Sequence, residues 1–354
     1  MIHALRLAFH QLRRQPRFAL LTVLVMGLAI AAATTVFTVV DSVVLQPLPY
    51  SEPDRLVALW DYNTEKGLSQ EPMSPVNFMD HRELDVFADA AAWWRPAVNL
   101  VDPGMEPTRV ETIETSANLF EVLGVRPQVG IGFPEDGPFH SSDQSVAVIS
   151  DRLWRTRYGA DTGIVGKPLM FNGAAYEIVG VMPAGFHFPD EVDVWQRLRW
   201  DLTQHSRYAH FMEGVARLAP DVTLAAAQAA TDGLAARLGT DHADSNAGWS
   251  MRLVPLLHDQ LGYYRPALLV LFGAVGLLLV IGVLNVSTLL YTRSLARERE
   301  IAVRVSMGAS PFQLLRQLLA EALVLAAGGA AVGLAVAAIA LPLLGRFVTT
   351  EVPR

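Results

Sequence analysis

The sequence has no cysteine and few charged residues. Without cysteine the chain cannot form disulfides, thiolate metal sites or cysteine nucleophiles, and its absence fits an oxidising compartment. Only 18% of the 354 residues are charged, and 51% are hydrophobic. That is too apolar for an average soluble protein and too polar for a pure helix bundle. We therefore expect apolar segments separated by an ordinary soluble region.

The sequence also lacks a nucleotide-binding loop. Gly166-Lys167 resembles the end of a phosphate-binding loop, but Asp161 stands at the position of its first glycine. Pro168 replaces the serine or threonine that would bind magnesium. Because the backbone cradle cannot form, the chain is not expected to bind ATP in this way.

Other catalytic and metal-binding patterns are missing too. Neither a G-x-S-x-G elbow nor an H-E-x-x-H motif occurs. One acid-rich cluster, His187, Asp190, Glu191 and Asp193, has a spacing that matches no zinc or calcium loop, which favours a solvated loop. We predict that the protein is not an enzyme and has no catalytic, cofactor-binding or metal-binding residues.

Three charge-free runs are long enough to cross a membrane. They are residues 18–40, 266–292 and 322–345. The first run has 23 residues, roughly 35 Å of helix at about 1.5 Å per residue, against a bilayer core of about 30 Å. Backbone groups in lipid must be bonded internally, so each run should be a helix. The first run could instead be a signal peptide cleaved after Ala31-Ala32-Ala33, but it is much longer than a signal core.

The distribution of charge predicts the topology. Residues 1–17 contain four arginines and no acid, and residues 293–321 contain five arginines. Positively charged flanks remain in the cytoplasm. Residues 41–265 hold 31 acidic and 17 basic residues, which disfavours nucleic-acid binding. The expected order is a cytoplasmic segment (1–17), a span (18–40), an extracytoplasmic domain (41–265), a span (266–292), a cytoplasmic elbow (293–321), a span (322–345) and an extracytoplasmic tail (346–354).

The first cytoplasmic segment has helical periodicity. Leu5, Ala8, Phe9 and Leu12 follow the spacing of one apolar helix face, with basic residues opposite. An amphipathic helix on the inner leaflet has this pattern. A simple positive flank explains the charges equally well and predicts the same topology.

The second cytoplasmic segment predicts a helix, a turn and a new helix. Residues 293–307 are compatible with a helix, and Glu300 and Arg304 form a favourable i,i+4 pair. Gly308 can end that helix. Ser310 can cap the next, with Pro311 in its first turn. This elbow could bind another protein, although its charge pattern alone favours a solvated turn.

Small and polar residues within the spans predict helix packing. Gly329 and Gly333 form a G-x-x-x-G motif that lets two helices approach closely. Asn285 is a polar residue in the second span. A single amide is better explained by packing between helices than by a transport route.

The extracytoplasmic domain is expected to be α+β. Strand-like runs cover 55–60, 146–149, 176–181 and 251–256, and helix-like runs cover 151–158 and 224–238. The two kinds of element do not alternate regularly, which favours α+β over a doubly wound sheet. The tryptophans, which all lie in this domain, suit a packed core.

Several motifs together resemble those of FtsX/MacB-type ABC transporter permeases. In the elbow they are REIAVR at 299–304, MGAS at 307–310 and LLRQLLAEAL at 314–323. Elsewhere they are RQPRF before the first span, LQPLPY after it, VLGV at 122–125, NGxxYxIVGVMP at 172–183, and Asn285. The set covers nearly the whole chain. It is most similar to the subgroup of acidobacterial duplicated orphan permeases.

The resemblance implies a fold and a role. The extracytoplasmic domain would resemble the MacB periplasmic core, in a bacterial inner membrane. The elbow, with Arg299, Glu300, Arg304, Gly308, Ala309 and Ser310, would dock on a separate cytoplasmic ABC ATPase. Closure of that ATPase would then move the periplasmic domain, for export or to act on a periplasmic partner. The chain would work with a second permease half or as a homodimer.

The chain departs from this family in two respects. The subgroup often has a further basic residue after Arg304, where this chain has Val305. A family half also has four spans, so this chain is expected to be a truncated first half that lacks the fourth. A function of another class stays open, namely a membrane-anchored sensor or scaffold that binds a periplasmic partner without ATP coupling.

Overall fold

The computed structural model describes most of the chain. The described residues are 13, 16–41, 48–96, 99–100, 108–134, 145–171, 173–199, 201–262, 265–296, 298, 302–303, 306–307 and 311–348. The chain separates into two compact units, Met1–Gln46 with Leu261–Val352, and Pro47–Gln260 with Pro353–Arg354. We call the first the helix unit and the second the sheet domain, and describe each by itself.

The helix unit contains three long apolar helices. They are α2 (Pro16–Val40), α9 (Arg265–Ala296) and α11 (Pro311–Val348). Their stretches with the length and composition of a membrane span are Pro16–Thr38, Leu269–Arg293 and Leu315–Leu343. The prediction of three membrane helices is confirmed. α11 begins at Pro311, so the helix also includes the last residues of the predicted elbow, which precede the predicted third span.

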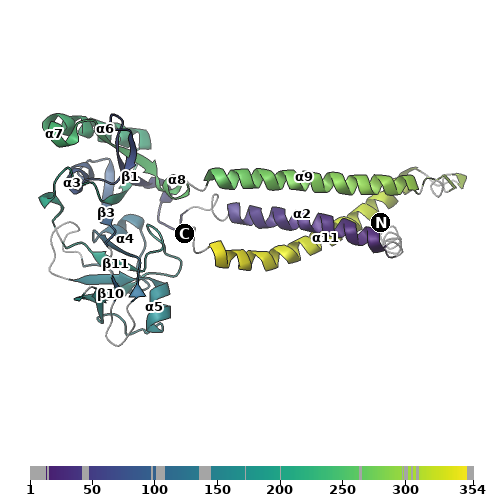
Figure 1. The fold of residues 1–354 in the computed structure, drawn as a ribbon, viewed down its shortest axis with the longest axis horizontal. Coiled ribbons are helices and arrows are strands. Elements are labelled where there is room, and N and C mark those ends of the chain that lie inside the picture. Colours follow the sequence, from purple (N-terminus) through teal and green to yellow (C-terminus); the bar gives the residue numbers. More distant parts are fainter. Residues whose placement is uncertain are drawn as a thin grey trace. The chain divides into compact units, whose positions relative to one another are not determined.

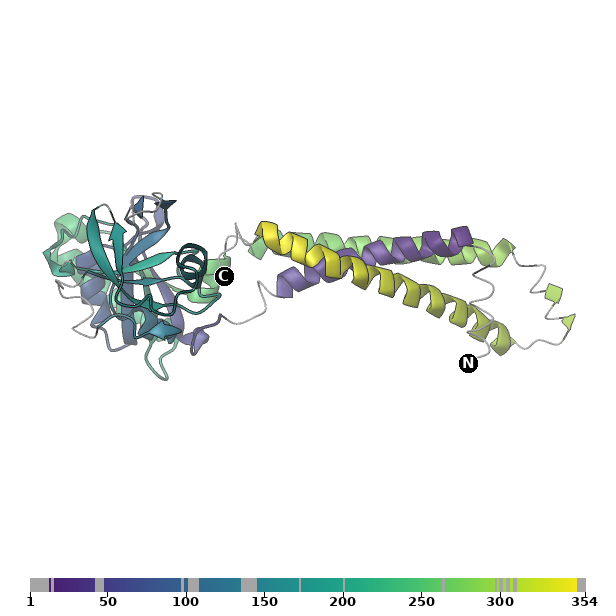
Figure 2. The ribbon, with the colours of Figure 1, turned by 90° about the horizontal axis from the view of Figure 1, so that it is seen from below.

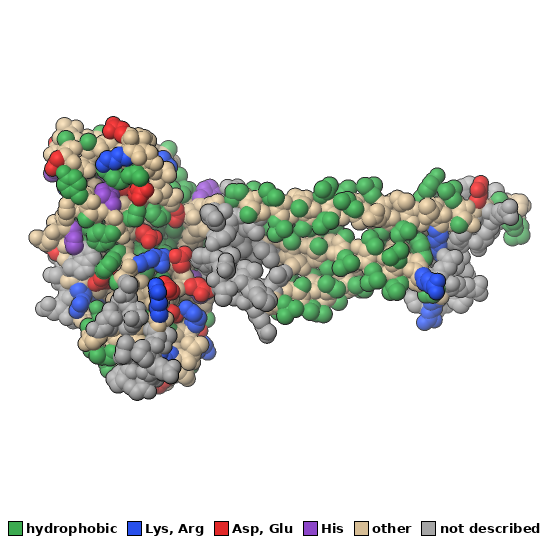
Figure 3. Space-filling view, viewed as in Figure 1, with side chains coloured by type: hydrophobic (Ala, Val, Ile, Leu, Met, Phe, Trp, Pro, Cys, Tyr) green, Lys and Arg blue, Asp and Glu red, His purple; other side chains and the backbone are tan. Residues whose placement is uncertain are grey.

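Helix α2 packs against both α9 and α11. The start of α2, the end of α9 and the start of α11 lie at the same end of the unit in two perpendicular views (Figures 1 and 2). Hydrophobic side chains cover the visible face of these helices, and charged side chains gather at that one end (Figure 3). The helices therefore present to their surroundings the apolar surface that a bilayer requires.

The described part of the sheet domain contains a single mixed sheet of thirteen strands. Its order is β13-β1-β12-β3-β6-β11-β8-β10-β9-β4-β5, with β2 paired to β1 and β7 to β10. Most pairs are antiparallel, but β6 with β11 and β8 with β10 are parallel. The strands are β1 (Leu56–Asn63), β2 (Leu68–Glu71), β3 (Phe87–Trp94), β4 (Asn99–Leu100), β5 (Thr108–Arg109), β6 (Thr112–Thr115), β7 (Val129–Gly130), β8 (Val146–Ile149), β9 (Pro168–Phe171), β10 (Ala174–Val181), β11 (Val194–Arg197), β12 (Glu213–Leu218) and β13 (Trp249–Pro255).

Short helices lie between the strands, and local caps define several of their ends. In α5, the hydroxyl of Ser150 accepts a hydrogen bond from the amide of Leu153 at 3.1 Å, and in α6 Thr223 caps Ala226 in the same way. Such N-caps satisfy amides that have no partner within the helix. The helices are η2 (Pro53–Arg55), α3 (Pro75–Arg82), α4 (Leu119–Leu123), α5 (Asp151–Tyr158), η3 (Leu202–Gln204), α6 (Leu224–Asp241), α7 (Ala243–Asn246) and α8 (Leu256–Leu261).

Strand periodicity divides the core between the two faces of the sheet. In β1, Leu56 and Ala58 belong to one hydrophobic cluster, whereas Val57 and Leu59 belong to another. This division follows from the alternation of side chains along a strand. Both faces of the strand are buried over its first half, which explains the unbroken apolar run from Leu56 to Trp60.

The α+β prediction for this domain is confirmed. The predicted helix at 151–158 is α5 with the same limits, and the predicted strand at 146–149 is β8. The predicted helix at 224–238 is α6, which extends to Asp241. The predicted strands at 55–60, 176–181 and 251–256 correspond to β1, β10 and β13, with ends that differ by at most three residues.

Candidate functional site

The six elbow residues that were predicted to dock all lie outside the described residues. Arg299, Glu300 and Arg304 fall there, as do Gly308, Ala309 and Ser310. The structure does describe the two helices that bound the elbow, because α9 ends at Ala296 and α11 begins at Pro311. The docking role of the elbow stays a prediction.

A buried ion pair joins the two helices that bound the elbow. A guanidinium nitrogen of Arg293, near the end of α9, lies 3.3 Å from the carboxylate of Glu321 on α11. Only 9% of the arginine side chain and 3% of the glutamate side chain are exposed. The guanidinium also lies over the ring of Phe18 on α2, 4.6 Å from its centre. One charged contact thus brings together all three helices at the end where α2 begins.

Sequence reasoning missed this pair, although the two residues are the first and last of the predicted elbow, 293–321. Arg293 directly follows the second charge-free run, and Glu321 directly precedes the third. Two opposite charges at the inner ends of two spans were the available signal. Charged groups near lipid are costly unless they are paired, and burial of both groups satisfies that condition here.

The glycines of the third helix lie against the first. A Cβ atom on Gly333 would lie 2.8 Å from the carbonyl oxygen of Gly27, and one on Gly329 would lie 2.6 Å from the Cβ of Met26. Contacts this short leave no room for a side chain. The structure therefore brings Gly329 and Gly333 together with α2 in a close helix crossing, the kind of contact that small residues allow in membranes.

Asn285 lies elsewhere on the helix unit. It is on the exposed face of α9. A glycine of α9 that does approach α2 closely is Gly282, where an added Cβ would lie 3.0 Å from the Cβ of Ala29. Within the described part of this chain, Asn285 therefore does not pack against another helix. Its packing against a helix of a neighbouring protein stays a prediction.

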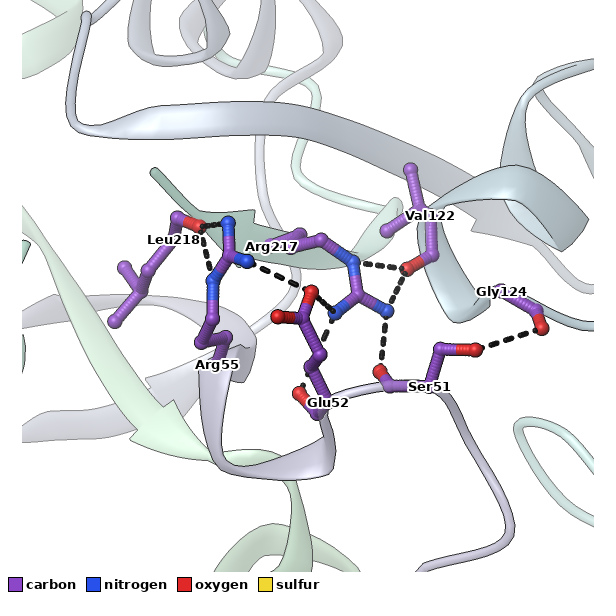
Figure 4. A network of polar contacts seen from close by, with 7 residues as sticks. All are labelled: Ser51, Glu52, Arg55, Val122, Gly124, Arg217 and Leu218. Atoms are coloured by element: carbon purple, nitrogen blue, oxygen red, sulfur yellow. Dashed lines mark hydrogen bonds and ion pairs between the residues drawn. The ribbon is translucent and has the colours of Figure 1, made fainter. Parts of the chain in front are cut away.

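A polar network holds the segment that leads into the first strand (Figure 4). We call residues 48–55 the junction segment, because it joins the sheet domain to the chain that follows α2. The guanidinium of Arg217 on β12 donates hydrogen bonds to the carbonyl oxygens of Ser51, Glu52 and Val122, at 2.7, 3.3 and 2.8 Å. Val122 belongs to α4. Burial of this group lowers the pKa of Arg217 from its ordinary value.

The junction segment makes further contacts with α4 and β12. The amide of Ser51 donates to the carbonyl of Leu123 at 3.2 Å, and its hydroxyl donates to that of Gly124 at 3.1 Å. A Cβ on Gly124 would lie 2.4 Å from the Cβ of Ser51, and its φ of +69° also requires glycine. The guanidinium of Arg55 donates to the carbonyl of Leu218 and to the carboxylate of Glu52.

The segment that leaves the sheet domain is also attached to it. Strand β13 pairs with β1 and leads directly into α8. The carboxylate of Asp259 on α8 accepts a hydrogen bond from the indole of Trp60 at 2.7 Å. Burial raises the pKa of Asp259. Tyr50 of the junction segment interacts with Gln260, and burial raises the pKa of its hydroxyl to about 12.

In the acid-rich cluster of the sequence, Asp190 and Asp193 each form an ion pair with a different arginine. Asp190 forms an ion pair with Arg95 at 2.6 Å, and Asp193 forms one with Arg152 at 2.8 Å. Burial raises the pKa of Asp193. Among the residues that the structure describes, no group of three or more acidic, histidine or cysteine side chains is arranged to hold a metal ion.

The sequence of the chain matches the models of two protein families. The family model of the MacB-like periplasmic core domain matches residues 19–234, more than half of the chain. The model of the FtsX-like permease C-terminal region matches residues 272–353. The chain belongs to the FtsX/MacB-type permeases. The recognition made from the elbow and span motifs is thereby confirmed, and the protein is a membrane component of the ABC transporter permease class.

Individual relatives are distant. The "Macrolide export ATP-binding/permease protein MacB" of Neisseria meningitidis is 26% identical over 235 residues, and that of Neisseria gonorrhoeae is 25% identical. The match covers 65% of this chain and 35% of the N. meningitidis protein. The chain thus spans about a third of the length of these relatives. The periplasmic region of MacB from Actinobacillus actinomycetemcomitans has a TM-score of 0.42 and 13% identity, over 59% of this chain and 93% of that one.

Proposed function

We propose that this permease couples a separate cytoplasmic ABC ATPase to movement of its sheet domain. In this proposal the helix unit lies in the inner membrane of a bacterium and the sheet domain lies in the periplasm. Export of a substrate, or action on a periplasmic partner, would be the output. The observation that carries the proposal is the arrangement of the helix unit. Both arginine-rich segments adjoin the same end of the three helices, where α2 begins, α9 ends and α11 begins (Figures 1 and 2).

The buried pair Arg293–Glu321 supports this coupling role. The elbow connects α9 to α11, and the pair joins these same helices directly beside it. A push on the elbow would therefore move both helices together.

The orientation can be tested by labelling single cysteines. Because the chain has no native cysteine, Ser145→Cys in the sheet domain and Ser294→Cys beside the elbow would each be unique. A membrane-impermeant maleimide applied to cells with a permeabilised outer membrane should label the first and not the second. Permeabilising the inner membrane should then label both. Labelling of Ser294→Cys alone in the first condition would show that the orientation is reversed.

The docking role of the elbow can be tested by charge reversal. If Glu300 and Arg304 only pair with each other, the double change Glu300→Arg with Arg304→Glu should restore what either single change loses. If they contact an ATPase, the double reversal should still fail, because the partner's charges are unchanged. Pairs within one exposed helix contribute only about 0.3–0.5 kcal/mol, whereas charge reversals at an interface cost several.

The readout is co-purification of an ATPase in detergent, detected by photolabelling with azido-ATP. Membrane insertion of every variant is checked by the cysteine assay above. Arg237→Glu, on the exposed face of α6 in the sheet domain, serves as a charge-reversal control that should leave binding intact. Recovery of binding by the double reversal would exclude this pair as a docking contact. Absence of any ATP-labelled partner from the parent protein would favour a sensor or scaffold instead.

A further inference from the structure

The junction segment belongs to the covalent route from α2 to the sheet domain. It runs from residue 48 to β1, and another route leaves β13 through α8 toward α9. The start of β1 pairs with the ends of both neighbouring strands, Leu56 with Arg217 of β12 and Val57 with Pro255 of β13. A pull on the junction segment therefore reaches the sheet at the ends of three adjacent strands.

Without side-chain contacts, such a pull would be absorbed locally. η2 is a single turn of three residues, and Glu52 before it has a left-handed backbone with φ of 45°. One turn of 3₁₀ helix has poor hydrogen-bond geometry and little resistance to extension. Force would straighten the segment before it moved the core of the domain.

The Arg217 network prevents this straightening by its geometry. A single guanidinium reaches carbonyl oxygens on both sides, those of Ser51 and Glu52 on the junction segment and that of Val122 on α4 (Figure 4). Its fixed fork of donors can hold several acceptors at once, which a lysine ammonium on a flexible stem does poorly. The side chain as a whole is 11% exposed. Its bonds to Val122 are partly buried, whereas its bonds to Ser51 and Glu52 lie at the surface.

Helix α4 in turn is anchored in the core. Leu119 and Leu123 are fully buried, and Phe120 stacks on Phe133 at 5.4 Å. The last carbonyls of a helix have no partner within it, and here the junction segment and Arg217 supply the donors for Val122, Leu123 and Gly124. The network thus connects the chain after the first span to the largest hydrophobic cluster of the domain.

We propose that Arg217 is a positioning residue for mechanical coupling: it holds the junction segment rigid, so that movement of the first span is delivered to α4 and β12. The proposal deepens the coupling function proposed above and rests on it for its biological meaning. The rigidity itself belongs to this chain alone and is measurable without an ATPase, so the two proposals can fail separately.

The test is single-molecule pulling on the full chain in detergent. DNA handles are attached through cysteine pairs, which are unique because the native chain has none. One pair, Gln46→Cys with Arg237→Cys, applies force through the junction segment to the exposed face of α6. The other pair, Val165→Cys with Arg237→Cys, applies force across the sheet domain without loading the junction.

Arg217→Lys and Arg217→Ala are compared with Arg252→Ala. Arg252 lies on β13, stacks on Tyr62 at 4.7 Å and does not contact the junction segment. We expect both Arg217 variants to show an early extension along the junction axis. Its size should be up to roughly 3 nm, since eight residues extend by about 3.5 Å each. The parent and Arg252→Ala should extend in a single later step.

Pulling across the domain separates positioning from general stability. Along that axis, both Arg217 variants should unfold at the parental force. Equal weakening along both axes would show that Arg217 only stabilises the fold, and would overturn the proposal. Absence of the early extension in both Arg217 variants would overturn the proposal too. So would an early extension that occurs in Arg217→Ala but not in Arg217→Lys, because a positive charge without the guanidinium fork would then suffice.

Discussion

The helix unit and the sheet domain are stabilised by different contacts. The sheet domain buries large apolar side chains on both faces of its strands, such as Trp195 and Phe78, which are fully buried. The helix unit leaves most of its leucines exposed and instead packs at Gly27, Gly329 and Gly333. In water the burial of apolar area stabilises a core. Between helices in lipid that force is absent, so close backbone approach and polar contacts replace it.

The two units also treat charge differently. Exposed ion pairs such as Arg155–Asp151 lie on the surface of the sheet domain, where water screens them. The described ion pair of the helix unit, Arg293–Glu321, is almost fully buried. A single change in the helix unit should therefore matter more than a similar change on the sheet domain, and the following predictions test that contrast.

The largest effect is expected at the buried ion pair. Glu321→Ala removes a carboxylate partner of the buried Arg293 guanidinium, which should cost about 3–5 kcal/mol of the free energy of unfolding. Arg293→Met combined with Glu321→Leu should recover most of this loss, because no charge then stays buried. The measurement is unfolding of the full chain by SDS in mixed micelles. Arg316→Ala, on the same helix but exposed, should have little effect. A loss in Arg316→Ala as large as in Glu321→Ala would contradict the contrast.

A smaller loss is expected at the close helix crossing. Gly333→Ala places a methyl group 2.8 Å from the carbonyl oxygen of Gly27, and forcing the helices apart should cost about 1–3 kcal/mol. Gly276→Ala on α9 is the matched control, since its Cβ would meet nothing within 4 Å. The same SDS titration measures both. Equal stability of the two variants would mean that this crossing does not stabilise the unit.

In the sheet domain, a pH effect is expected at Asp259. Burial raises its pKa in the folded state, so the folded domain binds this proton more tightly than the unfolded chain does. Its contribution to stability is therefore complete at acid pH and is lost as the pH rises above about 3.9 and through the raised pKa. Asp259→Asn keeps an oxygen for the Trp60 indole and should reduce this pH dependence, as measured by thermal unfolding from pH 4 to pH 7. An unchanged slope would show that Asp259 titrates normally.

The smallest effect is expected from removing the helix unit altogether. The segment 45–262 has the composition of a globular domain, and its hydrophobic clusters are made by its own residues. We expect the purified fragment to be soluble and to unfold in one cooperative thermal transition, with a midpoint close to that of the domain in the full chain. A fragment without such a transition would show that the domain depends on the helix unit.

Local patterns accounted for much of the fold. Helix α5 has the limits of the predicted helix-like run at 151–158. The structure shows that Ser150 caps its start and Gly159 follows its end, and both act within one turn of the chain. The strand ends were less accurate, since β1 extends to Asn63 through pairing with β13, a partner about 190 residues away. Pairing over such a distance leaves no mark in a local window of sequence.

The candidate sites were predicted less completely. The spacing of the glycines of α11 predicted that they pack against a helix, but it did not predict that this helix would be α2. Arg217 carried no signal, because nothing distinguishes it from the other basic residues of the domain. Its role depends on carbonyl groups of Ser51 and Val122, which are backbone atoms present at every position.

The sequence by itself determined the three spans, the arginine-rich segments beside them and several strand-like runs. Each of these follows from hydrophobicity or charge within a short window. Only the tertiary structure decided which residues meet. It placed Arg217 beside Ser51, 166 positions earlier, and Glu321 beside Arg293 across the elbow. The physical reason is distance. A guanidinium can bond several carbonyl oxygens or form an ion pair only when folding brings these acceptors within about 3 Å of it.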